Sequence, residues 1–339
     1  MDMADKRWKR FIITTIVLLF LILVAFLISL NLGTYPISPI DTIRTLVGAG
    51  TEEESLVLFG FRLPRMVLAL LIGAGLAVSG AVLQGITQNE LAEPGIIGIN
   101  SGAGLAVVLF IYFFEGSTSA LGSLSVFAMP FFALIGALVA AFFIYILAWK
   151  QGIAPVRLIL VGIAVNAGFS AVLIVFQLRM DPNDFMQATV WLSGSIWGAT
   201  WSSVLSILPW IVILVPFTLW KSQHLNVLNL GDQVATGLGA AVEKERRILL
   251  IAAVALAGVS VAVGGGIAFL GLVAPHLARR LVGPGHHFLI PIAALMGALL
   301  LLAADTLGKN LLAPSEIPVG LVVSALGAPY FIYLLMKTN

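Results

Sequence analysis

The sequence contains no cysteine and very little charge. The lack of cysteine excludes disulfide bonds and thiolate metal sites. Only 10% of the 339 residues are charged, whereas a soluble domain carries about 25%. Hydrophobic residues make up 60% of the chain, and the mean hydropathy is +1.08. A soluble core could not bury this much apolar surface, so we expect the chain to lie in a lipid bilayer.

Motifs for catalysis, metal binding and ion coupling are also missing. The four histidines do not form an HExxH or similar metal spacing, and no GxxxxGK[ST] phosphate-binding loop occurs. The apolar runs are nearly free of the acidic residues that bind coupling ions in many carriers, although Asp305 lies near the end of one run. We therefore expect no catalytic residue, no metal site and no cofactor in this chain, and an energy source outside it.

Ten apolar segments approach the ~20 residues that a helix needs to cross a bilayer. The first follows four basic residues like a signal peptide. Its length and the lack of a small-x-small cleavage site predict an uncleaved span instead. The segment 267–281 is short, and the count of ten is weakest there. The predicted spans are 11–30, 64–83, 96–114, 126–149, 156–177, 201–220, 248–263, 267–281, 288–307 and 317–336.

Basic residues are distributed unevenly between the predicted loops. With the N-terminus in the cytoplasm, 13 of the 18 lysines and arginines lie on the cytoplasmic side, in agreement with the positive-inside rule. Omitting the span at 267–281 would move the C-terminus outside and weaken this agreement. We therefore expect a multi-pass protein of the plasma or inner membrane with both termini in the cytoplasm.

The stretch from residue 62 to residue 103 is the one around which we expect the chain to be organised. Arg62 and Arg65 precede a glycine-rich apolar run, a short polar turn and a second apolar run, which predicts two spans joined by a tight turn. A small-residue helix between an arginine and a proline recurs from Arg247 to Pro275, but it begins on the opposite side of the membrane. This pattern favours an inverted repeat, which is a common transporter architecture.

We therefore predict one all-α transmembrane domain over residues 1–339, with about ten spans and an inverted-repeat core. Its parts are a first helix with an external segment (1–61), a first repeat (62–180), an external helix with the sixth span (181–220), a cytoplasmic loop (221–247) and a second repeat (248–339).

Five segments, in this order, resemble one known family. They are RLPR (62–65), GAGLAVSGAVLQ (73–84), NELAEPGIIGINSGAG (89–104), GGGIAFLGLVAPHLARRLVG (264–283) and SEIPVGLVVSALGAPYFIYLLMK (315–337). The sequence resembles the permease subunits of ATP-binding-cassette (ABC) importers for iron–siderophores, haem and cobalamin, the FecCD type. The resemblance implies a fold like that of cobalamin permeases. It also implies a dimer with an identical or related permease, two cytoplasmic ATPase subunits that use ATP and Mg, and an external substrate-binding protein.

The resemblance implies a docking site for the binding protein at three basic residues. In the family, basic residues on the outer face receive acidic side chains from the binding protein. Arg62 and Arg65 match the arginines of the family's RLPR, and Lys309 stands where the family often has arginine. An exposed arginine pair is well suited to bind carboxylates. Such a pair guides the approach of the binding protein and fixes its position more than it raises the affinity. Ordinary anchoring at the membrane interface is the alternative.

A second implied site is the loop that couples the permease to the ATPase. In the family this loop forms two short helices that meet at a glycine. The matching segment is 231–247, with Gly231, Asp232, Ala235 and Gly239 as coupling residues and Gly239 at the turn. A plain solvated loop is the alternative, but an apolar face favours docking. That face is formed by Leu225, Val227, Leu228, Leu230, Val234 and Leu238.

A third implied site is the translocation pathway. In relatives the fifth and tenth spans line it, which points to Asn166, Ser170 and Gly320. Hydrogen bonding between helices is the simpler role for the two polar residues. The chain departs from the family in the turn after the second span, where Gln88 replaces a basic residue and Glu90 replaces a proline. The fine structure of that turn is therefore open.

We predict a permease subunit, without an ATPase site of its own, that takes up an iron(III)–siderophore complex. The siderophore is chosen because it is the commonest cargo of the family. Haem or cobalamin as cargo, an ion-coupled secondary transporter, and a membrane receptor or scaffold without transport are the alternatives.

Overall fold

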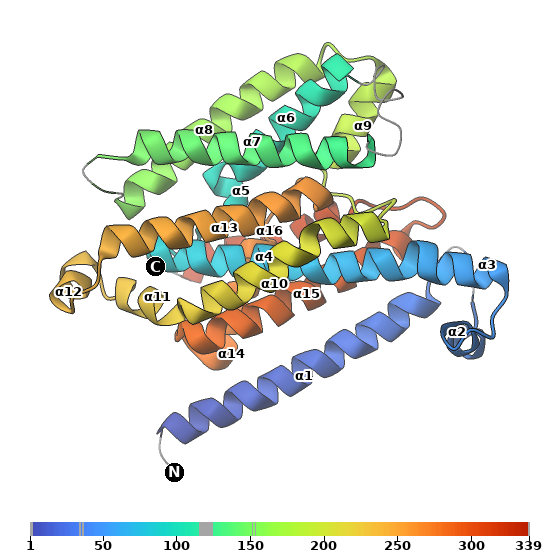
Figure 1. The fold of residues 1–339 in the computed structure, drawn as a ribbon, viewed down its shortest axis with the longest axis horizontal. Coiled ribbons are helices and arrows are strands. Elements are labelled where there is room, and N and C mark those ends of the chain that lie inside the picture. Colours follow the sequence, from blue (N-terminus) through green and yellow to red (C-terminus); the bar gives the residue numbers. More distant parts are fainter. Residues whose placement is uncertain are drawn as a thin grey trace.

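The computed structural model describes residues 3–33, 35, 37–114, 125–150, 152 and 154–337, and these residues form helices without a β-strand (Figure 1). The helical elements, in chain order, are α1 (Met3–Asn31), α2 (Pro39–Leu46), α3 (Glu52–Ser55), the π-helix η1 (Leu56–Arg62), α4 (Leu63–Thr87), α5 (Pro94–Ile97), α6 (Ile99–Phe114), α7 (Ser125–Ala148), α8 (Pro155–Gln177), α9 (Pro182–Leu192), α10 (Trp201–Trp220), α11 (Ser222–Leu228), α12 (Asp232–Gly237), α13 (Val242–Gly264), α14 (Leu270–Val282), α15 (His286–Leu311) and α16 (Val319–Lys337).

Nine of the ten predicted spans each correspond to one helix, and the third corresponds to α5 and α6 together. Within the described residues, seven helices are long and apolar enough to cross a membrane: α1, α4 with α3 and η1, α7, α8, α10, α13 and α15. The helices α6 and α16 are shorter apolar helices. At 13 residues, α14 is the shortest of the ten, as the sequence predicted for the segment 267–281.

Helix α4 is the most buried of the seven long spans. Within the most apolar part of its span 78% of the residues are buried, against 6% for α1. It packs against α15, α13, α14 and α10, and in Figure 1 it runs through the middle of the bundle. The stretch that begins at Arg62 is therefore the centre of the fold, as predicted.

Small residues let the central helices touch along their main chains. A Cβ on Gly73 of α4 would lie 2.3 Å from the carbonyl oxygen of Gly297 in α15, and one on Gly80 would lie 1.8 Å from that of Gly271 in α14. A third close approach joins Gly102 of α6 to α7. Lipid tails are as apolar as leucine, so close van der Waals packing of this kind, rather than the hydrophobic effect, holds membrane helices together.

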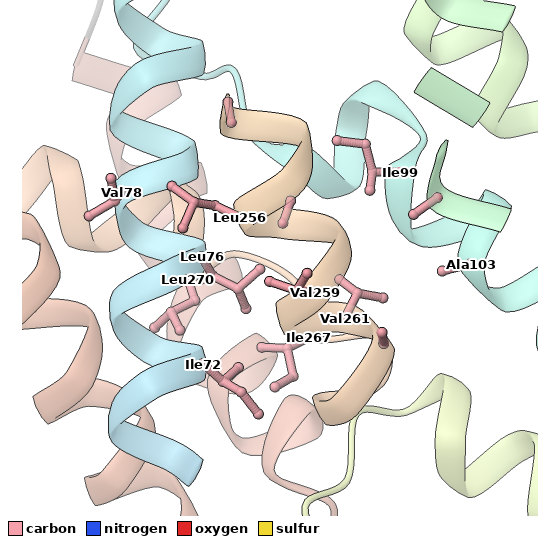
Figure 2. Packing of buried hydrophobic residues seen from close by; sticks show 14 of the residues in the cluster. Ile72, Leu76, Val78, Ile99, Ala103, Leu256, Val259, Val261, Ile267 and Leu270 are labelled. Atoms are coloured by element: carbon pink, nitrogen blue, oxygen red, sulfur yellow. The ribbon is translucent and has the colours of Figure 1, made fainter. Parts of the chain in front are cut away.

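Figure 2 shows how α13 fills the space between α4 and α6. Ile72 and Leu76 of α4 face Leu256 and Val259 of α13, with Ile267 close by, and all five belong to one buried apolar cluster. The apolar part of α13 is therefore packed against α4 on one side and α6 on the other. The charged residues of α13 are confined to its first turns.

The predicted third span is broken in the structure. Gly98, with φ of +100°, separates the four-residue α5 from α6. A side chain at this position would be strained in the left-handed region, and a Cβ would also lie 3.2 Å from the main chain of α8. The prediction of one helix over 96–114 is therefore wrong at its start. A second irregular turn, with Phe269 at φ of +65°, precedes α14.

The two ends of the bundle carry different short helices. In Figure 1, α2 and α3 lie at one end, whereas α11, α12 and both chain ends lie toward the other. Arg62 at the end of η1 and Gly239 after α12 are therefore far apart along the bundle. The sequence predicted opposite sides of the membrane for these two residues, and the fold is consistent with that.

Candidate functional site

The three predicted docking residues lie together at the α2–α3 end. Arg62, Arg65 and Lys309 line one cavity of about 220 Å³, together with Glu316 and Tyr35. The cavity is placed where the π-helix η1 runs into α4, and π-helical turns are frequent at functional sites. The structure thus brings together residues that are more than 240 positions apart in the sequence.

Two of these basic side chains are buried and bind neighbouring main chain. Arg62 is 8% exposed, and its guanidinium donates hydrogen bonds to the carbonyl oxygens of Leu30 and Tyr35. Lys309 is 7% exposed and donates to the carbonyl and hydroxyl oxygens of Ser29, at 3.0 and 2.9 Å. The expectation that the arginine pair is exposed is therefore wrong for Arg62, which instead fastens the start of α4 to the end of α1.

Arg65 is held by two carboxylates. Its guanidinium donates to both oxygens of the buried Asp305, with a shortest distance of 2.7 Å, and to Glu316 at 2.8 Å. The side chain of Arg65 is 15% exposed, and that of Glu316 is 28% exposed. Both carboxylates were missed as site residues. The signal was available for Asp305, because a lone acid in an apolar run needs a cationic partner.

A larger cavity of about 800 Å³ adjoins this cluster. Arg65 and Glu316 line both cavities. The remaining wall comes from Met129 of α7, from α9 with Trp191, from the following loop with Trp197, and from the segment before α16, including Pro318. Its volume is within the range of small-molecule sites, about 300–1,000 Å³. This end of the bundle therefore holds a hollow with aromatic walls and a charged rim.

The three predicted pathway residues have different surroundings. Asn166 and Ser170 are half-buried on α8, and the main chain of Asn166 lies against Gly98. Gly320 is buried at the start of α16, where its N–H donates to the carbonyl oxygen of Gly194 at 2.9 Å. Gly320 thereby joins α16 to the loop after α9, and a shared pathway for the three stays a prediction.

The predicted coupling loop forms two short helices, α11 and α12, as expected. They meet at Gly231, whose φ is +92°, so placing the turn between them at Gly239 was wrong. Gly239, with φ of +83°, lies in the turn from α12 into α13. Asp232 accepts a hydrogen bond from the buried Arg246 at 2.6 Å, and Ala235 is fully buried. These contacts fix α12 against the start of α13.

The apolar face of this loop is divided between the core and the surface. Leu225 and Leu228 of α11 are buried, whereas Leu230, Val234 and Leu238 are more than half exposed. A groove of about 250 Å³ opens beside Leu238 and Gly239. Large apolar side chains gathered at the aqueous end of a membrane protein indicate a protein interface.

The turn after α4, which departs from the family pattern, is tied to its surroundings. Gln88 donates to the carbonyl oxygen of Leu228 in α11 at 2.8 Å. Glu90 forms an ion pair with Arg279 at 3.1 Å, and its carboxylate lies 3.4 Å from the imidazole ring of His276. Both unusual residues therefore have partners, and Gln88 links the central helix directly to the predicted coupling loop.

A buried carboxyl group connects the two irregular turns. Glu93, just before α5, is 4% exposed and accepts a hydrogen bond from the N–H of Phe269. Asn100 of α6 donates to the carbonyl oxygen of Ile267 at 3.1 Å. Burial raises the pKa of Glu93 from 4.5 to about 7, although the bond from Phe269 acts in the opposite direction.

This raised pKa predicts a pH-dependent stability. A carboxyl group whose pKa is higher in the folded state stabilises the fold below pH 4.5, and this contribution is lost as the pH rises to about 7. Glu93→Gln keeps a neutral acceptor for Phe269. We expect its thermal unfolding temperature to match the wild type at pH 5 and to exceed it at pH 8. The exposed Glu52→Gln serves as the control and should show no such difference. A wild-type advantage at pH 8 would contradict the assignment.

Comparison with known proteins agrees with this architecture. Residues 20–337 match the model of the FecCD transport family. The iron(3+)-hydroxamate import system permease protein FhuG of Bacillus subtilis (strain 168) is 64% identical over 337 residues, which cover 99% of this chain and all of that protein. The hemin transport system permease protein HmuU of Yersinia pestis is 40% identical over 94% of both chains.

A solved structure shares the fold. It is assigned to the metal-chelate type of ABC transporters and described as inward-facing. It superposes with a TM-score of 0.83 and 30% identity, over 95% of this chain and 98% of that one. The family model, the near full-length relatives and this shared fold lead to one conclusion: the chain belongs to the FecCD transport family.

Proposed function

We propose that this chain is the membrane-spanning permease subunit of an ABC importer for iron(III)–hydroxamate siderophores. The observation that carries the proposal is the 64% identity, over its whole length, to a permease named for iron(3+)-hydroxamate import. Permeases named for citrate and hemin systems are more distant, at 41% and 40% identity. Other ferric chelates and haem are therefore the cargoes to be tested against hydroxamates.

The two ends of the bundle fit the two partners that such a permease needs. The hollow of about 800 Å³ beside Arg65 would receive the chelate from an external binding protein. The exposed apolar side chains in and beside α12 at the other end would dock on an ATPase subunit, which binds ATP and Mg. We place this second end in the cytoplasm, with both chain termini.

Helix α8 supports a dimer. In its most apolar part only 22% of the residues are buried. One exposed stripe is built of small residues, including Ala164, Gly168 and Ala171, and a Cβ on Gly168 would meet open space. Small residues let membrane helices approach closely. We propose that a second permease, identical or homologous, covers this face.

Reconstitution tests the function directly. The permease would be placed in vesicles with its partner permease and the ATPase, and with the binding protein outside. We expect radioactive ferric hydroxamate to accumulate only with ATP inside the vesicles, and excess ferric citrate, haemin or cobalamin to compete weakly. Uptake driven by a proton or sodium gradient without the ATPase would contradict the importer. Stronger competition by haemin would contradict the hydroxamate assignment only.

Glu316 offers a test of the docking site that leaves the fold intact. If a carboxylate of the binding protein reaches Arg65, it must compete with Glu316, which is partly exposed and 2.8 Å away. Glu316→Gln keeps the bond from Arg65 to Asp305 and removes the competing charge. We expect the binding protein to bind a few-fold more tightly, because exposed ion pairs contribute about 0.2–1 kcal/mol.

The matched control is Arg44→Gln in α2, which alters the exposed pair with Asp41 at the same end of the bundle. It should leave the affinity unchanged. Surface binding measurements with the immobilised permease complex would compare the variants at low and high salt. If Glu316→Gln binds the binding protein equally or more weakly than the wild type, the assignment of Arg65 to the docking site is contradicted.

A further inference from the structure

An apolar cleft between α7 and α13 has no part in the functions described so far. Its volume is about 470 Å³, and it is lined by apolar residues of α4, α5, α6, α7 and α13. At its mouth, Phe142 and Ile251 are 60% and 63% exposed, whereas Leu83, Ile97 and Ile99 on its inner wall are buried. The cleft therefore runs from the surface that faces lipid into the core.

The cleft has a polar end as well as an apolar interior. Among its lining residues, Tyr145 and Arg247 carry the polar groups. Arg247 lies in the second turn of α13, at the same end of the bundle as α11 and α12. No described ion pair involves Arg247, whereas its neighbour Arg246 is buried and paired with Asp232.

Aromatic side chains mark the depth of this polar end in the membrane. Trp149, at the end of α7, packs on Tyr145 with 5.6 Å between ring centroids and is 44% exposed. Tryptophan and tyrosine favour the boundary between hydrocarbon and headgroups. Arg247 is therefore placed at headgroup level, and the apolar part of the cleft lies at the level of the acyl chains.

We propose that this cleft is a binding site for an anionic glycerophospholipid. One acyl chain would occupy the apolar interior, and the phosphate-bearing headgroup would lie against Arg247 and the hydroxyl group of Tyr145. Basic pockets between membrane helices recognise anionic headgroups in this way. The bound chain would also touch Ile97 and Ile99, on either side of the break at Gly98.

Charge removal tests the headgroup. The full-length permease would be reconstituted in bilayers with equal amounts of phosphatidylglycerol and phosphatidylethanolamine, released gently, and analysed by native mass spectrometry for retained lipid. We expect phosphatidylglycerol to be enriched about fivefold in the retained lipid, which corresponds to about 1 kcal/mol for one basic residue near an anionic headgroup. Arg247→Gln should abolish the enrichment. Lys244→Gln, an exposed residue one turn earlier that lines none of the cavities described, should keep it.

Filling the mouth of the cleft tests the acyl chain. Ile251→Trp should remove both retained lipids. Val212→Trp, on an exposed position of α10 outside the cleft, should leave them in place. The proposal is overturned if Arg247→Gln keeps the enrichment, if Lys244→Gln loses it equally, or if Ile251→Trp retains lipid as the wild type does. Wild-type permease that retains no lipid would also overturn the proposal, and a helix of another chain would then be the expected occupant of the cleft.

Discussion

Replacing Gly80 with alanine is expected to destroy the packing of the central helix. A Cβ at this position would lie 1.8 Å from the carbonyl oxygen of Gly271 and 2.7 Å from its Cα, so two main chains would have to separate. Overpacking a core costs about 1–3 kcal/mol. Here the Cβ would collide with main chain, which no rotamer change can move. We therefore expect the free energy of unfolding to fall by an amount at or above the upper end of that range.

Heating followed by size-exclusion chromatography measures this effect. Gly80→Ala should give little folded permease, or lose its folded peak about 4 °C or more below the wild type, as about 3 kcal/mol implies for a chain of this size. Gly237→Ala at the end of α12 is the matched control, because a Cβ there meets open space. It should fold normally and be unchanged or slightly more stable, since alanine is the better helix former. Equal stability of the two variants would contradict the close packing of α4 and α14.

Placing a charge on the exposed face of α12 is expected to weaken the binding of the permease to its ATPase. Val234 is 51% exposed and Leu238 is 65% exposed, so neither is needed for the fold, and Val234→Glu should leave the unfolding temperature unchanged. If these side chains fill a groove on the ATPase, burying a carboxylate there costs at least about 2 kcal/mol. That is a loss of affinity of roughly 30-fold or more.

Co-purification and uptake measure this second effect. Val234→Glu should retain less than a tenth of the ATPase that the wild type retains, and its ferric-hydroxamate uptake should fall in parallel. Val47→Glu provides the matched control, because Val47 is exposed in the same way after α2 at the opposite end. Normal ATPase retention by Val234→Glu would show that this face of α12 is not the coupling surface.

The helices were predictable because each depends on local composition. An apolar run long enough to cross a bilayer has to become a helix, since no water is present to satisfy its main chain. For the same reason the short predicted span at 267–281 became a short helix, α14. The break at Gly98 was not predictable in the same way. It depends on the close approach of α8, whose Gly162 and Asn166 lie against Gly98.

The sites were less predictable than the helices because their partners are distant in sequence. Arg65 was expected to be exposed, but its partner Asp305 is 240 residues away, and no local pattern connects the two. The resemblance to the family predicts the helix–helix turn at Gly239, but the loop contains several glycines that could form it. Only the left-handed conformation of Gly231 between α11 and α12 identifies the one that does.

The contact between Gly73 and Gly297 limits how this protein can switch between outward-open and inward-open states. At this contact main chain rests on main chain, so α4 and α15 have no side chains there that could change rotamer and slide. Alternating access should therefore carry the two helices as one rigid body. The adjustment should fall where the helices are already interrupted, at the irregular turns around Gly98 and Phe269.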